Sequence, residues 1–509
     1  MKSRRIRSLK VTALAFIARN ISYWDEMIPE DPDSYLYLLG PFEGLDHGLT
    51  QELFDTLVKN DKFLPKHVHL LFHSQLDSID LSKSTTFRLG ESILKILLKR
   101  CKKIKSLKLS DGTRYSKSML NLIPYNYSNL ESLIFNNENM SDEFVANLVR
   151  YCPSLLCFQS SNCERLNTDS FLRMKLLTNI QVLTLGNADA LTDDILLQIF
   201  TSCKKIKHIS LPMTAVNFEA FASNHVFFSI QAIDLTLSDR IDDNSVHKIV
   251  ASCPNLKALC LSNCRGITEK SLEVIAENCQ MLENLNISYC SIKKYSEVIK
   301  RFLKRAGHSL NSIDFSGISD LRTSLFAQYC SHIEKLFLNH CPYLATEWVP
   351  YVLWQEVMQR NTLHNDKFMK EMISLGGKHE KYSLLQMCPL LNNLQIDLQK
   401  KKSDDSDFDL QAILQGGYNT KTLCLVELPQ FDDNNLRDLK NFMDTEKIEH
   451  LNISGNAKVT AGGIWYAVEN MKSLKIMEVR GCDIFDSELD ALKKKIIMDG
   501  YDVDLIGHK

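Results

Sequence analysis

The chain lacks the gross features that would assign it to a membrane or to a polyanion. No uninterrupted apolar run approaches the roughly 18 to 20 residues that a spanning helix needs, so we predict no membrane partner. An excess of one charge is also missing, because 60 Lys and Arg residues face 62 Asp and Glu residues, for a formal net charge of −2. A near-neutral chain has no overall field that attracts phosphate backbones, so we predict no nucleic-acid partner.

The short motifs of catalysis and metal binding are missing too. We find no G-x-S-x-G elbow, no P-loop, no G-x-G-x-x-G sequence and no cysteine pair with the C-x-x-C spacing of zinc sites. His67, His69 and His73 have the spacing H-x-H-x-x-x-H, but no Glu lies between the last two, and a helix explains them better. The sequence therefore predicts a protein that is not an enzyme and that holds no cofactor and no metal.

What the chain does have is a repeated apolar pattern. Its 44% apolar content is enough for a large core, since disordered chains are far less apolar. The pattern apolar-x-x-apolar-x-apolar, with two weaker copies, starts at Leu76, Ile104, Leu130, Leu155, Ile180, Ile206, Ile230, Leu256, Leu282, Leu310, Ile333, Leu391, Thr420, Ile448 and Leu474. Successive starts lie 23 to 29 residues apart, except for one interval of 58. This period is typical of leucine-rich repeats.

Each repeat predicts a short strand followed by a helix. The fourth and sixth positions of the pattern share one face of a strand, and Leu272, Ile275 and Ala276 fall on one helical stripe. Thr268 is placed as an N-cap, with Glu269 at the favourable end of the helix dipole. One unit cannot bury its core alone, so neighbours must stack. The predicted fold is α/β: a leucine-rich-repeat solenoid (horseshoe) of about 15 repeats with an N-terminal helical cap.

The cysteines support the same period independently. Seven lie three residues before a pattern start and five lie eight residues after one: Cys101, Cys152, Cys203, Cys253, Cys279, Cys330 and Cys388, then Cys163, Cys264, Cys290, Cys341 and Cys482. Cysteine fills small buried slots well. An odd count without a secretory context favours free thiols in a reducing compartment, so we predict a cytoplasmic or nuclear location.

One repeat carries a family resemblance. Residues 253–268 read C-P-N-L-K-A-L-C-L-S-N-C-R-G-I-T, which resembles the cysteine-containing leucine-rich repeat of F-box/leucine-rich-repeat proteins and of antagonist-of-mitotic-exit-network proteins. The resemblance covers roughly residues 70 to 490. It implies a solenoid that binds a protein, and an N-terminal helical box that docks on a Skp-type or elongin adaptor of a cullin ubiquitin ligase.

The N-terminus matches such a box in degenerate form. Trp24 lies too early for an F-box. One segment resembles an elongin-binding box, S-L-x-x-x-C-x-x-x-I with Ala in place of Cys, and its matching residues are Ser8, Leu9, Ala13 and Ile17. A second segment resembles a cullin-contact helix with Asp46 in place of Pro, and its matching residues are Leu45, Leu49 and Leu53. The resemblance implies that these residues contact the adaptor complex.

Two other readings of the N-terminus stay open. Leu9, Ala13, Phe16 and Ile17 form one apolar helix face suited to a groove on a partner, but the same helix could simply cap the exposed end of the stack. Alternatively, basic residues before the apolar run at 11–18 would suit a targeting leader, although eight apolar residues are few for one.

We expect the substrate protein on the concave strand face. The predicted contact residues are Asn284, Asn286, Tyr289, Asp314, Lys335, Phe337, Asn339 and His340. Aromatic side chains on solvent-facing strand positions are reasonable anchors, although scattered exposed apolar residues are also ordinary. The family resemblance implies a non-catalytic substrate-recognition subunit of a cullin–RING ubiquitin ligase, and the alternative is a scaffold or regulator that binds a protein without any ligase.

The predicted organisation has four segments. Residues 1–74 form the helical cap and possible adaptor-binding box, and residues 75–342 form the first part of the solenoid. Residues 343–387 form an atypical repeat or an insertion that acts as a lid, and residues 388–509 complete the solenoid with its C-terminal cap.

Overall fold

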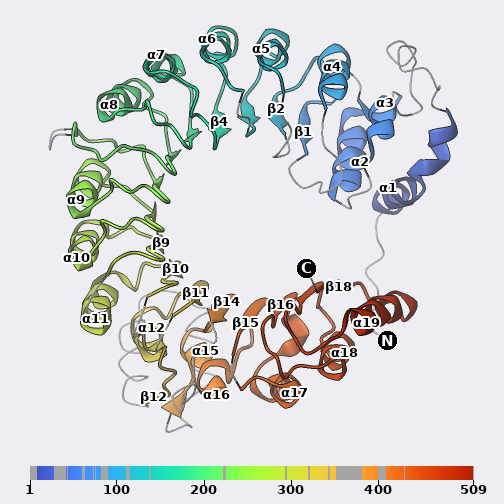
Figure 1. Cartoon of the computed structure of the whole chain (residues 1–509), viewed down its shortest axis with the longest axis vertical. Helices are drawn as coiled ribbons and strands as arrows, with labels where there is room; N and C mark the ends of the chain where they lie inside the picture. Colours follow the sequence, from blue (N-terminus) through green and yellow to red (C-terminus); the bar gives the residue numbers. More distant parts are fainter. Residues whose placement is uncertain are drawn as a thin grey trace. The chain divides into compact units, whose positions relative to one another are not determined.

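The structure, a computed structural model, describes residues 9–507 apart from 28–41, 43, 60–62, 73, 75, 82–89, 110–114, 137–138, 222–224, 293–294, 319–320, 342–343, 351–380, 399–408 and 429. The chain divides into two compact units, residues 1–238 (unit 1) and residues 239–509 (unit 2). The same repeat of strand and helix builds both units, so each is described in turn (Figure 1).

Unit 1 begins with helices and continues with the repeats. Its α-helices are α1 (Leu9–Arg19), α2 (His47–Lys59), α3 (Val68–Leu71), α4 (Glu91–Arg100), α5 (Lys117–Asn126), α6 (Asp142–Tyr151), α7 (Thr168–Arg173) and α8 (Asp193–Ser202). Short 3-10 helices are η1 (Ile21–Met27), η3 (Pro65–His67) and η4 (Met174–Leu176). Its parallel strands are β1 (Ser78–Asp80), β2 (Ser106–Lys108), β3 (Ser132–Ile134), β4 (Cys157–Ser160), β5 (Val182–Leu185), β6 (His208–Ser210) and β7 (Ala232–Asp234).

Unit 2 continues the same alternation. Its main strands are β8 (Ala258–Cys260), β9 (Asn284–Asn286), β10 (Ser312–Asp314), β11 (Lys335–Asn339), β14 (Asn393–Asp397), β15 (Thr422–Val426), β16 (His450–Asn452), β17 (Ile476–Glu478) and β18 (Asp504–Ile506). Its helices are α9 (Asp243–Ser252), α10 (Glu269–Asn278), α11 (Tyr295–Ala306), α12 (Thr323–Tyr329), α15 (Leu384–Met387), α16 (Leu410–Leu414), η5 (Thr445–Lys447), α17 (Asp433–Phe442), α18 (Ala461–Asn470) and α19 (Asp486–Met498).

The fourth position of the apolar pattern sets the register between strands. In unit 1 the aligned side chains are Ile79, Leu107, Leu133, Phe158, Leu183, Ile209 and Ile233. In unit 2 they are Leu259, Leu285, Ile313, Leu336, Leu394, Leu423, Leu451 and Met477, and Leu505 of β18, which lies outside the pattern, aligns with Met477. All of them are buried, at 2% exposure or less except Leu505 at 4%. A slip of one residue would turn this row outward, so burial fixes the register.

The 58-residue interval adds no strand to the main ladder between β11 and β14, which pair directly with Leu336 opposite Leu394. Its described ends meet in an antiparallel pair, β12 (Val349–Pro350) and β13 (Lys381–Tyr382). Residues 351–380 lie outside the described residues, so the prediction of a lid or an atypical repeat over 343–387 stays a prediction.

Helix caps join neighbouring repeats. As predicted, Thr268 caps α10, and its Oγ1 accepts the amide of Lys270 at 3.3 Å. The carboxylate of Asp243, at the start of α9, accepts the amide of Thr268 at 2.9 Å, its hydroxyl at 2.6 Å and the amide of Ser271 at 3.2 Å. Equivalent bridges run from Asp142 to Asn167, from Asp193 to Asn217 and from Asp433 to Thr460. Asp142, Asp243 and Asp433 therefore satisfy free amides at the start of the next helix, whereas Asp193 satisfies amides of the loop between β6 and β7.

The cysteines are structural, as their spacing predicts. The seven that precede a pattern start are all helix C-cap residues. Three cysteines of the second slot donate to a carbonyl of the preceding repeat: Cys290 to Leu261 at 3.0 Å, Cys341 to Phe315 at 3.4 Å and Cys482 to Ile453 at 3.3 Å. All fifteen are free thiols, and burial raises the pKa of Cys253 to about 12. A thiol with that pKa stays protonated and unreactive at neutral pH.

Both units are α/β leucine-rich-repeat solenoids, which confirms the predicted fold class. Every one of the fifteen predicted patterns contains a strand. The structure adds β18, which follows no such pattern and pairs with β17. Among the described residues, no helix combines the length and apolar character that crossing a bilayer requires.

Candidate functional site

Helix α2 covers the first edge of the sheet in unit 1. The amide nitrogen of the Gln51 side chain donates to the main-chain oxygen of Ser78 in β1 at 2.9 Å, and its oxygen accepts the Ser78 amide at 3.4 Å. His47 Nε2 lies 3.2 Å from Asp77 Oδ2. An open sheet edge is a template for unwanted pairing, so this helix performs the capping role.

Helix α1 carries two apolar faces with different environments. Leu14 and Ala18 are buried, and Ile21 continues this face into η1. On the other face Ala13 is exposed, Phe16 is 65% exposed and Ile17 is half-buried. The buried face is sufficient for packing within the cap, so the second face is left to solvent.

The residues of the predicted box lie in both helices. Ser8 lies outside the described residues, and Leu9 is the first residue of α1. In the predicted cullin-contact segment Leu45 and Leu49 are half-buried, and Leu53 is fully buried in the cap. Asp46, which stands where that segment carries Pro, caps α2: its Oδ1 accepts the amide of Leu49 at 2.9 Å.

The predicted substrate-contact residues come together on three neighbouring strands of unit 2. In register, Asn284 of β9, Ser312 of β10 and Lys335 of β11 form one row. Asn286, Asp314 and Phe337 form the next row. Tyr289, Asn339 and His340 lie at or just beyond the strand ends. We call the eight predicted residues on this surface the strand-face patch.

Tyr289 and His340 meet across an intervening repeat. The phenol oxygen of Tyr289 hydrogen-bonds Nδ1 of His340, and the ring centroids lie 5.8 Å apart. His340 Nε2 lies 2.9 Å from Asp397 Oδ2. A phenol, an imidazole and a carboxylate therefore form one line across the end of strands β9 to β14.

Gly317 makes this contact possible. Tyr289 and His340 both adopt left-handed backbone angles, with φ of 57° and 54°, and Gly317 occupies the equivalent position between them with φ of 75°. A Cβ at Gly317 would overlap the Tyr289 ring. Only a residue without a side chain lets the ring of Tyr289 pass over this repeat.

The patch is suited to binding through hydrogen bonds. Burial, followed by the nearby carboxylates of Asp314 and Asp397, raises the pKa of Tyr289, so its phenol stays protonated at neutral pH. Asn339 donates through its side-chain amide to Gln395 at 3.4 Å. The sequence analysis missed Gln395 and Asp397 because the 58-residue interval separates them from β11. The apolar pattern that restarts at Leu391 predicts the strand that contains both residues, and it could have placed them beside β11.

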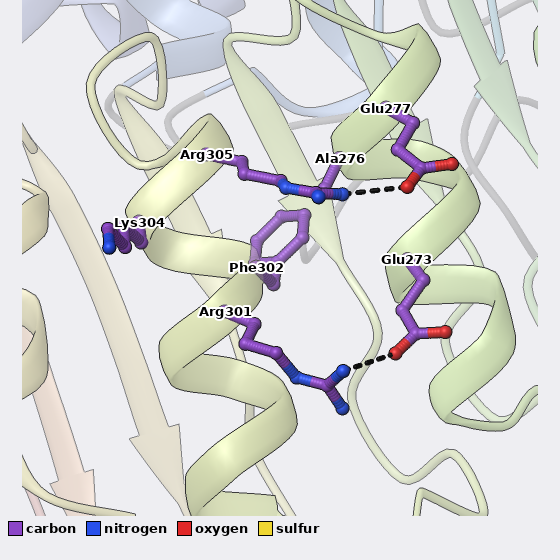
Figure 2. A pocket seen from close by; sticks show the side chains of 7 residues that line it. All are labelled: Glu273, Ala276, Glu277, Arg301, Phe302, Lys304 and Arg305. Carbon is purple, nitrogen blue, oxygen red and sulfur yellow. Dashed lines mark hydrogen bonds and ion pairs between the residues drawn. The ribbon is translucent and has the colours of Figure 1, made fainter.

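A pocket on the helix side of unit 2 lies between α10 and α11. It is lined by Glu273, Ala276, Glu277, Arg301, Phe302, Lys304 and Arg305. Figure 2 shows Arg301 and Arg305 reaching the two carboxylates, at 3.0 Å from Glu273 and 2.7 Å from Glu277, while Lys304 points away from them. The charges in the pocket are thus paired between adjacent helices, an arrangement that supports helix packing.

The described residues contain no group of three or more metal-ligating side chains. His67, one of the three histidines considered above, is 1% exposed, and its Nδ1 accepts the amide of Leu64 at 3.2 Å. His73 lies outside the described residues.

Comparisons with known proteins give only distant structural likenesses. No protein-family model and no curated protein matches the chain. The solved complex of Rad7 and Elc1 from yeast is similar over 95% of this chain and 96% of that chain, at 12% identity and a TM-score of 0.43. The complex of TLR13 with ssRNA13 is similar over 88% of this chain and 63% of that chain, at 16% identity and a TM-score of 0.32. Because both TM-scores are below 0.5, these likenesses support no inference about this chain.

Proposed function

We propose that the chain is the substrate-recognition subunit of a cullin–RING ubiquitin ligase. It acts as a non-catalytic interaction module in the cytoplasm or nucleus. An elongin-type adaptor binds the N-terminal helices, and the strand-face patch of unit 2 binds the protein substrate. The observation that carries the proposal is the apolar face of α1 that packing leaves uncovered, which includes Ala13 and Ile17, two of the four residues that resemble an elongin-binding box.

The exposed face of α1 fits a helix-in-groove contact. Single exposed apolar side chains are ordinary, but Ala13, Phe16 and Ile17 lie on adjacent turns of one helix. Such i, i+3, i+4 spacing is how an amphipathic helix anchors in a partner's groove. Capping needs only the face of Leu14 and Ala18, which is already buried.

A binding experiment with purified components tests this proposal. We expect the full chain to bind the purified elongin adaptor heterodimer in titration calorimetry, and Phe16→Asp to weaken binding at least tenfold. Leu176→Asp is the matched control, because Leu176 is 61% exposed and Phe16 is 65% exposed, both in unit 1. Both substitutions leave the core intact, so circular dichroism should show the same fold.

Two results would contradict the adaptor assignment. The first is a wild-type chain that binds no elongin adaptor at micromolar concentration. The second is Phe16→Asp binding as tightly as Leu176→Asp. Binding to a purified Skp-type adaptor instead would transfer the role to that adaptor.

The substrate face needs its own test. We expect proteins that co-purify with the wild-type chain to be lost from Tyr289→Ala/Phe337→Ala, while adaptor binding persists. Ile476→Ala is the control, since Ile476 is a 37% exposed apolar residue on β17. A partner that binds this face in cells without any adaptor or cullin would support the scaffold alternative.

A further inference from the structure

The near-neutral charge of the whole chain conceals a basic segment in unit 1. Residues 92–130 contain nine Lys and Arg residues and a single acid, Asp111. Helix α4 and the turn after it hold most of these cations. A local excess of this size produces a positive field at the surface even when the chain as a whole has none.

Some of these cations already have structural roles. Lys105 pairs with Glu131 at 3.4 Å, and Lys108 lies 3.9 Å from Asp80. Lys102 Nζ donates to Asn126 Oδ1 at 3.2 Å, which ties the end of α4 to the end of α5. Cations at helix C-termini are ordinary stabilising features.

Three exposed lysines remain beyond these roles. They are Lys95, Lys99 and Lys103, all exposed, and no ion pair recorded among the described residues involves them. Glu91 lies one turn before Lys95, but its Oε1 accepts the amide of Ser116 at 2.5 Å. The lysine charges therefore face solvent.

Two tyrosine rings, one exposed and one half-buried, lie at the ends of the next two helices. Tyr125 at the end of α5 is 54% exposed, and its ring centroid lies 4.6 Å from that of Tyr151 at the end of α6. The guanidinium carbon of Arg150 lies 5.3 Å from the Tyr151 ring centroid. Helices α4, α5 and α6 are consecutive (Figure 1), and the hydrogen bond from Lys102 to Asn126 joins the end of α4 to the end of α5. The residues on or just after these helices that we call the basic–aromatic patch are Lys95, Lys99, Lys103, Tyr125, Arg150 and Tyr151.

An internal comparison shows that the repeat itself does not require this patch. The sequence C-K-K-I-K occurs at residues 101–105 and again at residues 203–207. The helix before the second copy, α8, begins with Asp193 and Asp194 and has no basic residue, whereas α4 contributes Lys95 and Lys99. Two repeats with the same loop thus differ in the charge of the adjacent helix.

We propose that the basic–aromatic patch binds single-stranded nucleic acid without sequence selectivity. Lysine side chains pair with phosphates as point charges, and unpaired bases stack on exposed aromatic faces. An acidic polypeptide would use the lysines but has no general need for the exposed Tyr125 ring. This inference is independent of the ligase proposal, because it concerns helices α4 to α6 rather than the cap or the strand-face patch.

Fluorescence anisotropy of the full chain with labelled oligo-thymidine and oligo-uridine tests the proposal. We expect binding at low salt, and Lys99→Glu/Lys103→Glu should weaken it at least tenfold. The slope of the logarithm of the association constant against the logarithm of the salt concentration should become shallower by about 1.4. This follows because each phosphate contact on a single strand contributes about 0.7 to the slope, and the variant removes two lysines. The matched control is Lys204→Glu/Lys207→Glu, which makes the same charge change at two exposed lysines of the second copy and should weaken binding less than twofold.

A further variant, Tyr125→Ser, distinguishes a nucleic-acid ligand from an acidic protein ligand. Tyr125→Ser should weaken oligonucleotide binding about five- to tenfold, the value of one stacked base, and leave the salt slope unchanged. A poly-glutamate peptide should compete poorly. The proposal is overturned if the wild type binds neither oligonucleotide, if both lysine variants weaken binding equally, or if poly-glutamate binds as tightly and Tyr125→Ser has no effect.

Discussion

The acid bridge between α9 and α10 permits a quantitative test of how neighbouring repeats hold together. Asp243→Ala removes the acceptor of the Thr268 amide and hydroxyl and of the Ser271 amide and hydroxyl. Ser271 is 0% exposed, so its hydroxyl loses its partner in a buried position. An unsatisfied buried group costs about 1–3 kcal/mol, and loss of a helix cap costs about 1 kcal/mol. We therefore expect a loss of about 3 kcal/mol.

The matched control is Asp486→Ala. Asp486 is the first residue of α19, as Asp243 is of α9, but its side chain is exposed and forms no hydrogen bond to another repeat within the part of the chain that the structure describes. We expect a change within about 0.5 kcal/mol, as for an ordinary surface substitution. Urea unfolding followed by circular dichroism measures both, and hydrogen exchange of the α10 amides localises the loss.

The pH dependence gives a second check on the same bridge. Burial acts to raise the pKa of Asp243, but hydrogen bonds from Ser271 and Thr268 outweigh it and hold the pKa below the ordinary value of 3.8. The stabilisation is complete at neutral pH and is lost as the pH falls through the folded-state pKa. The gap in stability between wild type and Asp243→Asn should therefore narrow as the pH falls below 3.8 and close once the pH is below the folded-state pKa. A gap that persists below the folded-state pKa, or an Asp243→Ala chain as stable as Asp486→Ala, would refute the reasoning.

Three further outcomes are expected. Gly317→Ala places a Cβ against the Tyr289 ring at φ of 75°, so urea unfolding should show a loss of about 1–2 kcal/mol, and wild-type stability would contradict the packing described. Iodoacetamide at about pH 8 should alkylate half-buried Cys157 before Cys253, as read by peptide mass spectrometry; equal rates would argue against burial. Gln51→Ala should speed hydrogen exchange in β1, and unchanged exchange would mean that α2 does not protect this edge.

The sequence predicted the repeats well because their period follows from burial. A residue such as Leu259 must point to the core in every copy, so its spacing is visible without coordinates. The same holds for Cys253, which fills a small slot at each helix end, and for Thr268, whose capping preference is local. These features depend on a residue and its near neighbours in the chain.

Contacts between distant segments were decided only by the tertiary structure. His340 and Asp397 meet because β11 pairs with β14, and no local pattern reports what a 58-residue interval brings together. The sequence analysis assigned one apolar face to α1, whereas packing buries Leu14 and leaves Phe16 exposed. Periodicity identifies which side chains are apolar, but the partner that covers each one is set by the stacking of the chain on itself.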